Sequence, residues 1–194
     1  MRIGIDFDDV IYPYHPYLKR KIKDRFGVDL DAARVTTFFY DHHPELAARG
    51  ATRDEVWRMV EATWLDPDDH GEALLLDPAI PEILGTLQRR HDVAVISARS
   101  EASREHVVGF LKRHGIQVDE VLLGRFDKVG YDVLIDDFPK HAVENARHGG
   151  WSVLFTIDEN STFDETKEPR VLRAESWADV ARLIEAIEEM RDHA

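Results

Sequence analysis

Short apolar runs rich in β-branched residues alternate with amphipathic stretches along most of this chain. Runs of this kind are typical of strands buried on both faces of a sheet, and the stretches between them have the periodicity of helices. The predicted strands span residues 2–6, 93–97, 132–136 and 152–156, with a weaker fifth at 120–123. Strands that alternate with helices predict an α/β fold, a three-layer Rossmann-like parallel sheet with its functional crevice at the carboxyl ends of the strands.

The segment between the first two predicted strands is much longer than one crossover helix needs. Two stretches within it, residues 16–26 and 52–65, have helical patterns. We therefore expect residues 13–75 to form an inserted helical cap, with a core domain built from residues 1–12 and 76–194.

The carboxyl-terminal part of the chain reads as a loop followed by a helix. Residues 158–170 are polar and are predicted to form a loop, and residues 176–190 have an amphipathic helical pattern. Ser176 and Asp179 have the spacing of a capping box, so we expect them to begin this closing helix.

Composition restricts the classes of function. The chain has 194 residues, 43% of them hydrophobic, which suits one globular domain with an insertion. No apolar run is long enough to span a bilayer and no secretory leader is visible, which predicts a cytoplasmic protein without membrane association. The absence of cysteine excludes disulfides and thiol chemistry. A formal net charge of −13 argues against binding to polymeric nucleic acid, although a small anion could bind beside a local cation.

Two groups of aspartates follow predicted strands directly. Asp6, Asp8 and Asp9 end the first strand, and Asp136 and Asp137 end another. If the two strands are neighbours, these carboxylates converge, and their mutual repulsion would destabilise the fold unless a cation lies among them. Oxygen ligands of high charge favour Mg²⁺. The alternative is that the aspartates are only polar strand ends and helix caps.

A hydroxyl and an ammonium are predicted at the same edge of the sheet. Ser97 ends the second strand, and Lys128 precedes the strand that carries Asp136. Such groups can hold the oxygens of a phosphate. Taken singly, a serine at a strand end is more often a helix cap, and a loop lysine is more often a solvated surface residue.

The order Asp6-x-Asp8, Ser97, Lys128, Asp136-Asp137 resembles the four motifs of the haloacid dehalogenase (HAD) superfamily of phosphohydrolases. The position of the expected cap, straight after the first motif, is similar to that of the superfamily's helical caps. The sequences DFDDV and VLIDDFPKHAVENARHGGW are most similar to the 5′(3′)-deoxyribonucleotidase branch. The chain departs from the superfamily at Asp9, where glycine is common, but aspartate tolerates a left-handed backbone better than most residues do.

The resemblance implies a role for each motif residue in hydrolysing a phosphate ester. Asp6 would attack the phosphorus and form an aspartyl-phosphate. Asp8 would protonate the leaving alkoxide and then take a proton from the hydrolytic water. Ser97 and Lys128 would hold the phosphoryl oxygens.

The resemblance also implies a ligand set for Mg²⁺. The ion would be held by the Asp6 carboxylate, the main-chain carbonyl of Asp8 and one or both of Asp136 and Asp137. It would shield the anionic nucleophile from the anionic phosphate.

The substrate must be recognised by the cap, and the resemblance implies a small phosphorylated metabolite, in particular a nucleotide. Phe38, Phe39, Tyr40 and Trp64 are candidates for a face on which a nucleobase stacks. The alternative is that these aromatic residues form the core of the cap. Arg99 could reach the phosphate or the sugar, or could simply begin the next helix.

Other functions remain open at this stage. The same chemistry could act on another small ester, such as a sugar phosphate. A phosphate-accepting receiver-type module also uses clustered aspartates, but Asp54, the nearest mid-chain candidate for its phosphorylated residue, falls in a helical pattern. The histidines, His42, His43 and His141 among them, lack a zinc-binding spacing and are interpreted as surface or cap residues. The oligomeric state is also open, a homodimer included.

Overall fold

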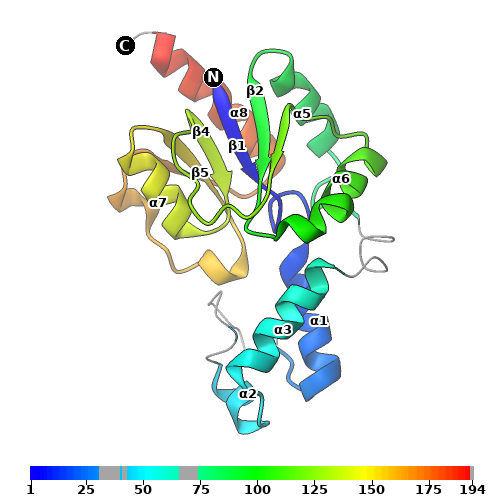
Figure 1. Cartoon of the computed structure of the whole chain (residues 1–194). Helices are drawn as coiled ribbons and strands as arrows, with labels where there is room; N and C mark the ends of the chain where they lie inside the picture. Colours follow the sequence, from blue (N-terminus) through cyan, green and yellow to red (C-terminus); the bar gives the residue numbers. More distant parts are fainter. Residues whose placement is uncertain (31–39, 41–42, 66–73, 193–194) are drawn as a thin grey trace.

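A single parallel sheet of six strands forms the centre of the computed structural model, which describes residues 1–30, 40, 43–65 and 74–192 (Figure 1). The strand order is β3-β2-β1-β4-β5-β6. The strands are β1 (Arg2–Asp6), β2 (Asp92–Ile96), β3 (Glu120–Leu122), β4 (Val133–Asp136), β5 (Trp151–Phe155) and β6 (Val171–Ala174). β1 lies between β2 and β4, so the two acidic strand ends are neighbours, as the predicted convergence requires.

Helices cover both faces of the sheet, which confirms the three-layer α/β prediction. The α-helices are α1 (Tyr14–Phe26), α2 (Pro44–Ala48), α3 (Arg53–Trp64), α5 (Ile80–Gln88), α6 (Arg104–Arg113), α7 (Pro139–Arg147) and α8 (Trp177–Asp192). Short 3₁₀ helices are η2 (Glu101–Ser103), η3 (Asp158–Asn160) and η4 (Glu165–Lys167). On β5, Val153 packs in the main core with α5 and α8, and the next residue, Leu154, packs on the other face with α7.

The five predicted strands are all present, with ends that differ from the prediction by no more than about one residue. The sixth strand, β6, was not predicted, because four residues that include an arginine and follow a polar loop give little strand signal. The helix α7 was not predicted either. In β6, the guanidinium of Arg173 is held by Glu165 and Asn160, so its charge is compensated at the edge of the sheet.

The predicted cap segment contains α1, α2 and α3, which lie beyond the carboxyl ends of the strands (Figure 1). Thr52 and Glu55 form a capping box that begins α3, so the helical pattern there is confirmed. The division of the chain into a cap and a core at residues 13 and 75 stays a prediction. None of the helices in the described ranges is long and apolar enough to cross a membrane.

The closing helix α8 holds the loop that follows β1. Its predicted cap is confirmed, because the Asp179 N–H donates to the Ser176 hydroxyl at 3.2 Å. Trp177, the first residue of the helix, is fully buried, and its Nε1 donates to the carbonyl of Val10 at 2.8 Å. The loop between β1 and α1 is therefore fastened by a residue from the far end of the chain.

Candidate active site

The first acidic motif lies on a tight loop at the carboxyl end of β1. The Tyr12 N–H donates to the Phe7 carbonyl at 2.9 Å, and the Asp9 N–H donates to the Tyr12 carbonyl at 2.7 Å. Asp9 has a φ of 55°, so it adopts the left-handed conformation that its residue type was expected to tolerate. This loop places Asp6 and Asp8 at the edge of the sheet where β4 also ends.

Lys128 joins the two acidic motifs. Its Nζ lies 2.6 Å from Oδ2 of Asp6 and 2.8 Å from Oδ2 of Asp136, and the side chain is almost completely buried. Burial alone would lower the pKa of Lys128, but the carboxylates of Asp136 and Asp6 outweigh burial and raise it. The ammonium is therefore a fixed positive charge within the cluster and not a solvated surface group.

Asp136 is fully engaged by protein donors. Besides Lys128, it accepts a hydrogen bond from the Phe138 N–H at 2.9 Å and lies 3.2 Å from Nδ1 of His141. Burial would raise the pKa of Asp136, but Lys128 and then His141 lower it to about 2. The interpretation of His141 as a surface or cap residue was wrong, because α7 carries its ring back to the end of β4, where it contacts Asp136.

Asp137 and Asp6 are the carboxylates whose pKa values are raised. Burial, Asp6 and Asp136 raise the pKa of Asp137 well above its ordinary value. Burial raises the pKa of Asp6 to about 7 against the opposing effect of Lys128, with further contributions from Asp136 and Asp8. One carboxylate oxygen from each of Asp6, Asp136 and Asp137 lies within 4.8 Å of the others. A cation among these oxygens would remove the repulsion that raises both pKa values.

Arg99 and Ser97 contact Asp8. The Arg99 Nε lies 3.1 and 3.0 Å from the two carboxylate oxygens of Asp8, and its Nη2 lies 2.6 Å from Oδ1. The Ser97 hydroxyl lies 3.5 Å from Oδ2 of Asp8 and accepts a hydrogen bond from the Arg99 N–H. Both side chains are buried, so in this structure they hold Asp8, and their phosphate-binding roles stay predictions.

Two of the predicted cap aromatics, Tyr40 and Trp64, lie in the described part of the chain and are buried or partly buried. Tyr40 is 2% exposed, its ring lies edge-on to His15, and its hydroxyl donates to Glu159 at 2.6 Å. Trp64 is partly buried and packs edge-on to Trp57. These contacts fit the cap-core alternative for both residues, and their substrate-binding roles stay predictions. The predicted aromatics Phe38 and Phe39 lie outside the described residues.

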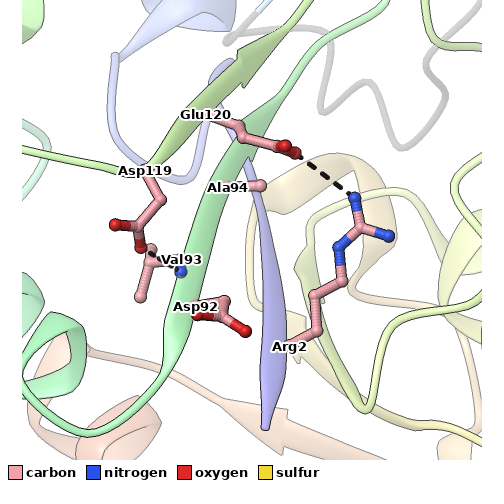
Figure 2. Close-up of a pocket in the computed structure, with 6 residues that line it drawn as sticks. All are labelled: Arg2, Asp92, Val93, Ala94, Asp119 and Glu120. Atoms are coloured by element: carbon pink, nitrogen blue, oxygen red, sulfur yellow. Dashed lines mark hydrogen bonds and ion pairs between the residues drawn. The ribbon is translucent and has the colours of Figure 1, made fainter.

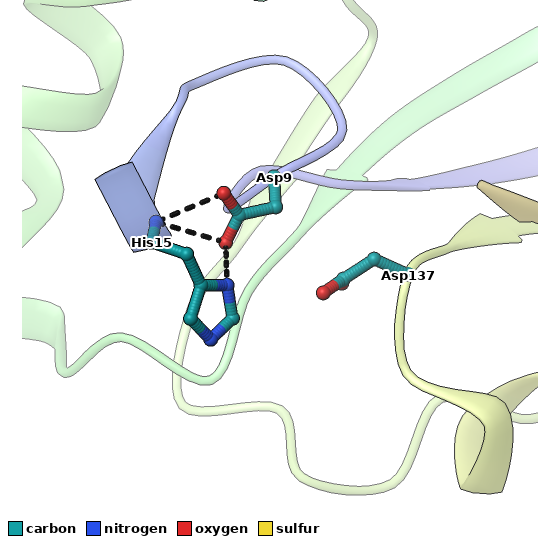
Figure 3. Close-up of side chains that lie close together, drawn as sticks. All are labelled: Asp9, His15 and Asp137. Carbon is teal, nitrogen blue, oxygen red and sulfur yellow. Dashed lines mark hydrogen bonds and ion pairs between the residues drawn. The ribbon is translucent and has the colours of Figure 1, made fainter. Parts of the chain in front are cut away.

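Sequence reasoning missed a buried polar group between α1 and the core. His15 contacts Asp9, with Asp137 pointing toward the pair (Figure 3). One turn further along α1, the Lys19 Nζ lies 2.8 Å from Glu159 of η3. The spacing of His15 and Lys19 on one helix face was visible in the sequence, but their partners come from a strained loop and an unpredicted turn.

A pocket of about 300 Å³ lies at the opposite end of the sheet, near the start of β1 and β2 (Figure 2). Within it, Nη2 of Arg2 forms an ion pair with Glu120 at 3.3 Å. Its lining residues are Arg2, Asp92, Val93, Ala94, Asp119 and Glu120. It is remote from the acidic cluster, because Arg2 and Asp92 begin the strands whose other ends carry the site.

Comparisons with known proteins agree with the fold and with the family that the sequence resembles. The family model described as 5′ nucleotidase, deoxy (pyrimidine), cytosolic type C protein (NT5C) matches residues 1–190. No curated protein sequence matches significantly.

Solved structures with a similar fold include three hydrolase-like proteins. A haloacid dehalogenase-like family hydrolase from Xanthomonas campestris has a TM-score of 0.64 at 13% identity, over 100% of this chain and 98% of that one. A predicted phosphatase from Clostridium acetobutylicum has a TM-score of 0.66 at 11% identity, over 94% and 97%. A predicted phosphoglycolate phosphatase from Haemophilus somnus has a TM-score of 0.59 at 14% identity, over 94% and 96%. At these identities the likeness concerns the fold alone.

Proposed function

Because the chain belongs to the family of cytosolic type C 5′-nucleotidases, which are phosphoric monoester hydrolases, we propose that it is a Mg²⁺-dependent 5′-nucleotidase acting on (deoxy)nucleoside monophosphates through an aspartyl-phosphate on Asp6. The observation that carries the mechanism is the placement of Asp6 against Lys128, with Asp8 two residues further along the same loop. The family's cytosolic description supports a cytoplasmic location within the same proposal.

Asp6 has the geometry of an oriented nucleophile. Its Oδ1 accepts a hydrogen bond from the Phe7 N–H at 2.7 Å, and its Oδ2 faces the Lys128 ammonium. One carboxylate oxygen would form a bond to phosphorus as the bond from phosphorus to the leaving oxygen breaks. Lys128 would then stabilise the negative charge of the phosphoryl oxygens as well as that of Asp6.

In this proposal Asp8 transfers protons in both steps. Its protonated carboxyl would give a proton to the leaving alkoxide in the first step. In the second step its carboxylate would take a proton from a water molecule, whose oxygen attacks phosphorus and releases Asp6 with inorganic phosphate. Arg99 contacts both oxygens of Asp8 and so fixes the plane of the carboxyl group.

The residues present fit Mg²⁺. Oxygens of Asp6, Asp136 and Asp137 gather at one place, and burial and mutual repulsion raise the pKa values of Asp6 and Asp137. Asp136 is engaged by Lys128 and His141, whereas the Asp137 carboxylate forms no hydrogen bond or ion pair within the described part of the chain. This difference supports Asp137, with Asp6 and the Asp8 carbonyl, as direct ligands. The bound ion would neutralise charge between nucleophile and phosphate.

The experiment that tests this proposal is steady-state hydrolysis of a panel of esters. Deoxynucleoside monophosphates, ribonucleoside monophosphates, sugar phosphates and p-nitrophenyl phosphate are each assayed with millimolar Mg²⁺ and with a chelator. We expect nucleotides to have the highest kcat/KM and chelation to abolish turnover of every ester. Preference for a sugar phosphate would overturn the substrate class, and full activity in the chelator would overturn the metal dependence.

A further inference from the structure

Asp9 combines a left-handed backbone with a buried and fully engaged carboxylate. Within the described ranges it is the only residue other than glycine with a positive φ. Its carboxylate oxygens accept from the backbone N–H of His15, at 2.9 and 3.2 Å. The His15 ring adds a further contact through Nδ1 (Figure 3). Asp9 therefore adopts a backbone conformation that is strained for a residue other than glycine, at a position where its side chain contacts His15.

His15 is the second residue of α1, and its N–H is one of the donors that a helix leaves unpaired at its start. Pro13, the residue before the helix, provides no side-chain cap. Asp9 supplies the missing acceptor from the preceding loop, and its negative charge lies where the helix dipole favours an anion. The contacts between Asp9 and His15 thus connect the loop after β1 to the start of α1.

We propose that Asp9 and His15 form a positioning clasp that holds the Asp8 loop against α1, and thereby keeps the acid–base carboxyl in the geometry that turnover requires. This inference rests on the proposed function. Asp8 directly precedes Asp9, and its side chain is held from the other side by Arg99. The position of Asp8 is therefore restrained twice. Arg99 contacts its carboxylate, and the contacts of Asp9 with His15 restrain the backbone beside it. Proton transfer depends steeply on such geometry.

The chain offers a matched control for a purely structural role. Lys19 lies one turn after His15 on the same helix, is also buried, and forms an ion pair with Glu159 of η3. A Lys19→Met variant removes a buried ion pair of α1 and leaves the side chains of Asp9 and His15 in place. We expect it to lower the melting temperature while kcat stays within about twofold of wild type.

The clasp is tested by kinetics of Asp9→Gly and Asp9→Asn. Glycine accepts the left-handed backbone but removes the anchor, so kcat should fall about tenfold or more while KM changes less than about threefold. Asparagine tolerates the backbone and retains an acceptor for the His15 N–H, so it should recover kcat to within about threefold of wild type. A wild-type kcat in Asp9→Gly, or an equal loss of kcat in Lys19→Met, overturns the proposal.

Amide hydrogen exchange separates failure of the clasp from failure of the proposed function. If the wild-type protein cleaves none of the esters, the proposed function fails, and the clasp is judged on exchange of the His15 amide alone. Exchange at least about tenfold faster in Asp9→Gly than in Lys19→Met supports the clasp. Equal exchange rates in the two variants overturn it.

Discussion

The Nζ of Lys128 lies 2.6 Å from Oδ2 of Asp6, so the proposed nucleophile carries its own counter-charge before any substrate arrives. The same ammonium lies 2.8 Å from Asp136, at the end of the neighbouring strand. This arrangement orients Asp6 and leaves Asp137 as the carboxylate with the least compensation from the protein.

Replacing the nucleophile and the acid should have different consequences. Asp6→Asn should abolish turnover, because the amide cannot form the phosphorylated intermediate. Asp8→Asn should lower kcat by about 10²–10⁴-fold, the usual contribution of a general acid, and should leave Mg²⁺ binding largely intact. Single-turnover assays with calorimetric titration of Mg²⁺ check both. Substantial turnover by Asp6→Asn would refute the mechanism.

Mg²⁺ should stabilise the folded protein. The unfolded chain has no comparable site, so a hundredfold excess of the ion over its Kd should add about 2.7 kcal/mol to the free energy of unfolding. For a chain of this size that corresponds to a rise in Tm of roughly 5–11 °C. Scanning calorimetry of metal-free protein, with and without millimolar Mg²⁺, measures the shift. An unchanged Tm would count against the site.

The metal-free protein should lose stability as the pH rises from about 4 to 7. The folded-state pKa of Asp6 is raised to about 7 and that of Asp137 is also raised, so the folded state binds more protons than the unfolded state in this window. Below about pH 4 the sign reverses for Asp136, whose folded-state pKa is about 2. Urea denaturation in a chelator should show this dependence of the free energy of unfolding on pH. With Mg²⁺ present, the loss of stability toward pH 7 should be smaller. A metal-free stability that rises up to pH 7 would contradict the charge assignment.

Removing the His141 ring should lower the free energy of unfolding, although His141 belongs to none of the four motifs. His141→Ala deletes a partner of the buried Asp136 carboxylate, and hydrogen bonds to charged groups contribute about 1.5–3 kcal/mol. His148→Ala is the control, because that residue follows the same helix and its ring contacts the main-chain oxygen of Glu144 at an exposed position. Urea denaturation of both variants should show a loss for His141→Ala alone. Equal losses would mean that the Asp136 contact contributes nothing specific.

Aromatic residues of the cap should affect nucleotides more than simple esters if they stack on the base. Phe39→Ala and Trp64→Ala are then expected to raise KM for nucleoside monophosphates, because each would remove a stacking interaction of about 1–3 kcal/mol. KM for p-nitrophenyl phosphate should change little. The kcat values should remain near wild type. If both variants instead lose stability and every activity together, these aromatics form the core of the cap.

The sequence was sufficient for the parts of the molecule whose signals are local. Each motif aspartate follows an apolar strand, so the pattern of a buried parallel sheet predicts Asp6 and Asp136 at the same edge, where the carboxyl ends of the strands lie. The cap of α8 at Ser176 was equally local. The fold class therefore followed from the chain's own periodicity, and the acidic cluster followed on the condition that β1 and β4 are neighbours, which they are.

Pairings across the fold could not be predicted in the same way. Nothing in the spacing of residues 99 and 8 shows that the Arg99 guanidinium contacts Asp8, and the contact of His141 with Asp136 depends on where α7 begins. The sequence left Tyr40 either in a base-stacking face or in the core of the cap, and it gave no sign that the hydroxyl donates to Glu159. These contacts depend on loop conformations, which local patterns do not determine.

The hydrogen bond from the Trp177 indole to Val10 has a consequence for the order of events during protein synthesis. A ribosome makes Asp6, Asp8, Ser97, Lys128 and both aspartates of the last motif before it reaches Trp177. A nascent chain at that stage would hold every proposed reacting group, but its first loop would lack the anchor supplied by α8. We expect competence for catalysis to appear late in translation, when the final helix docks against the beginning of the chain.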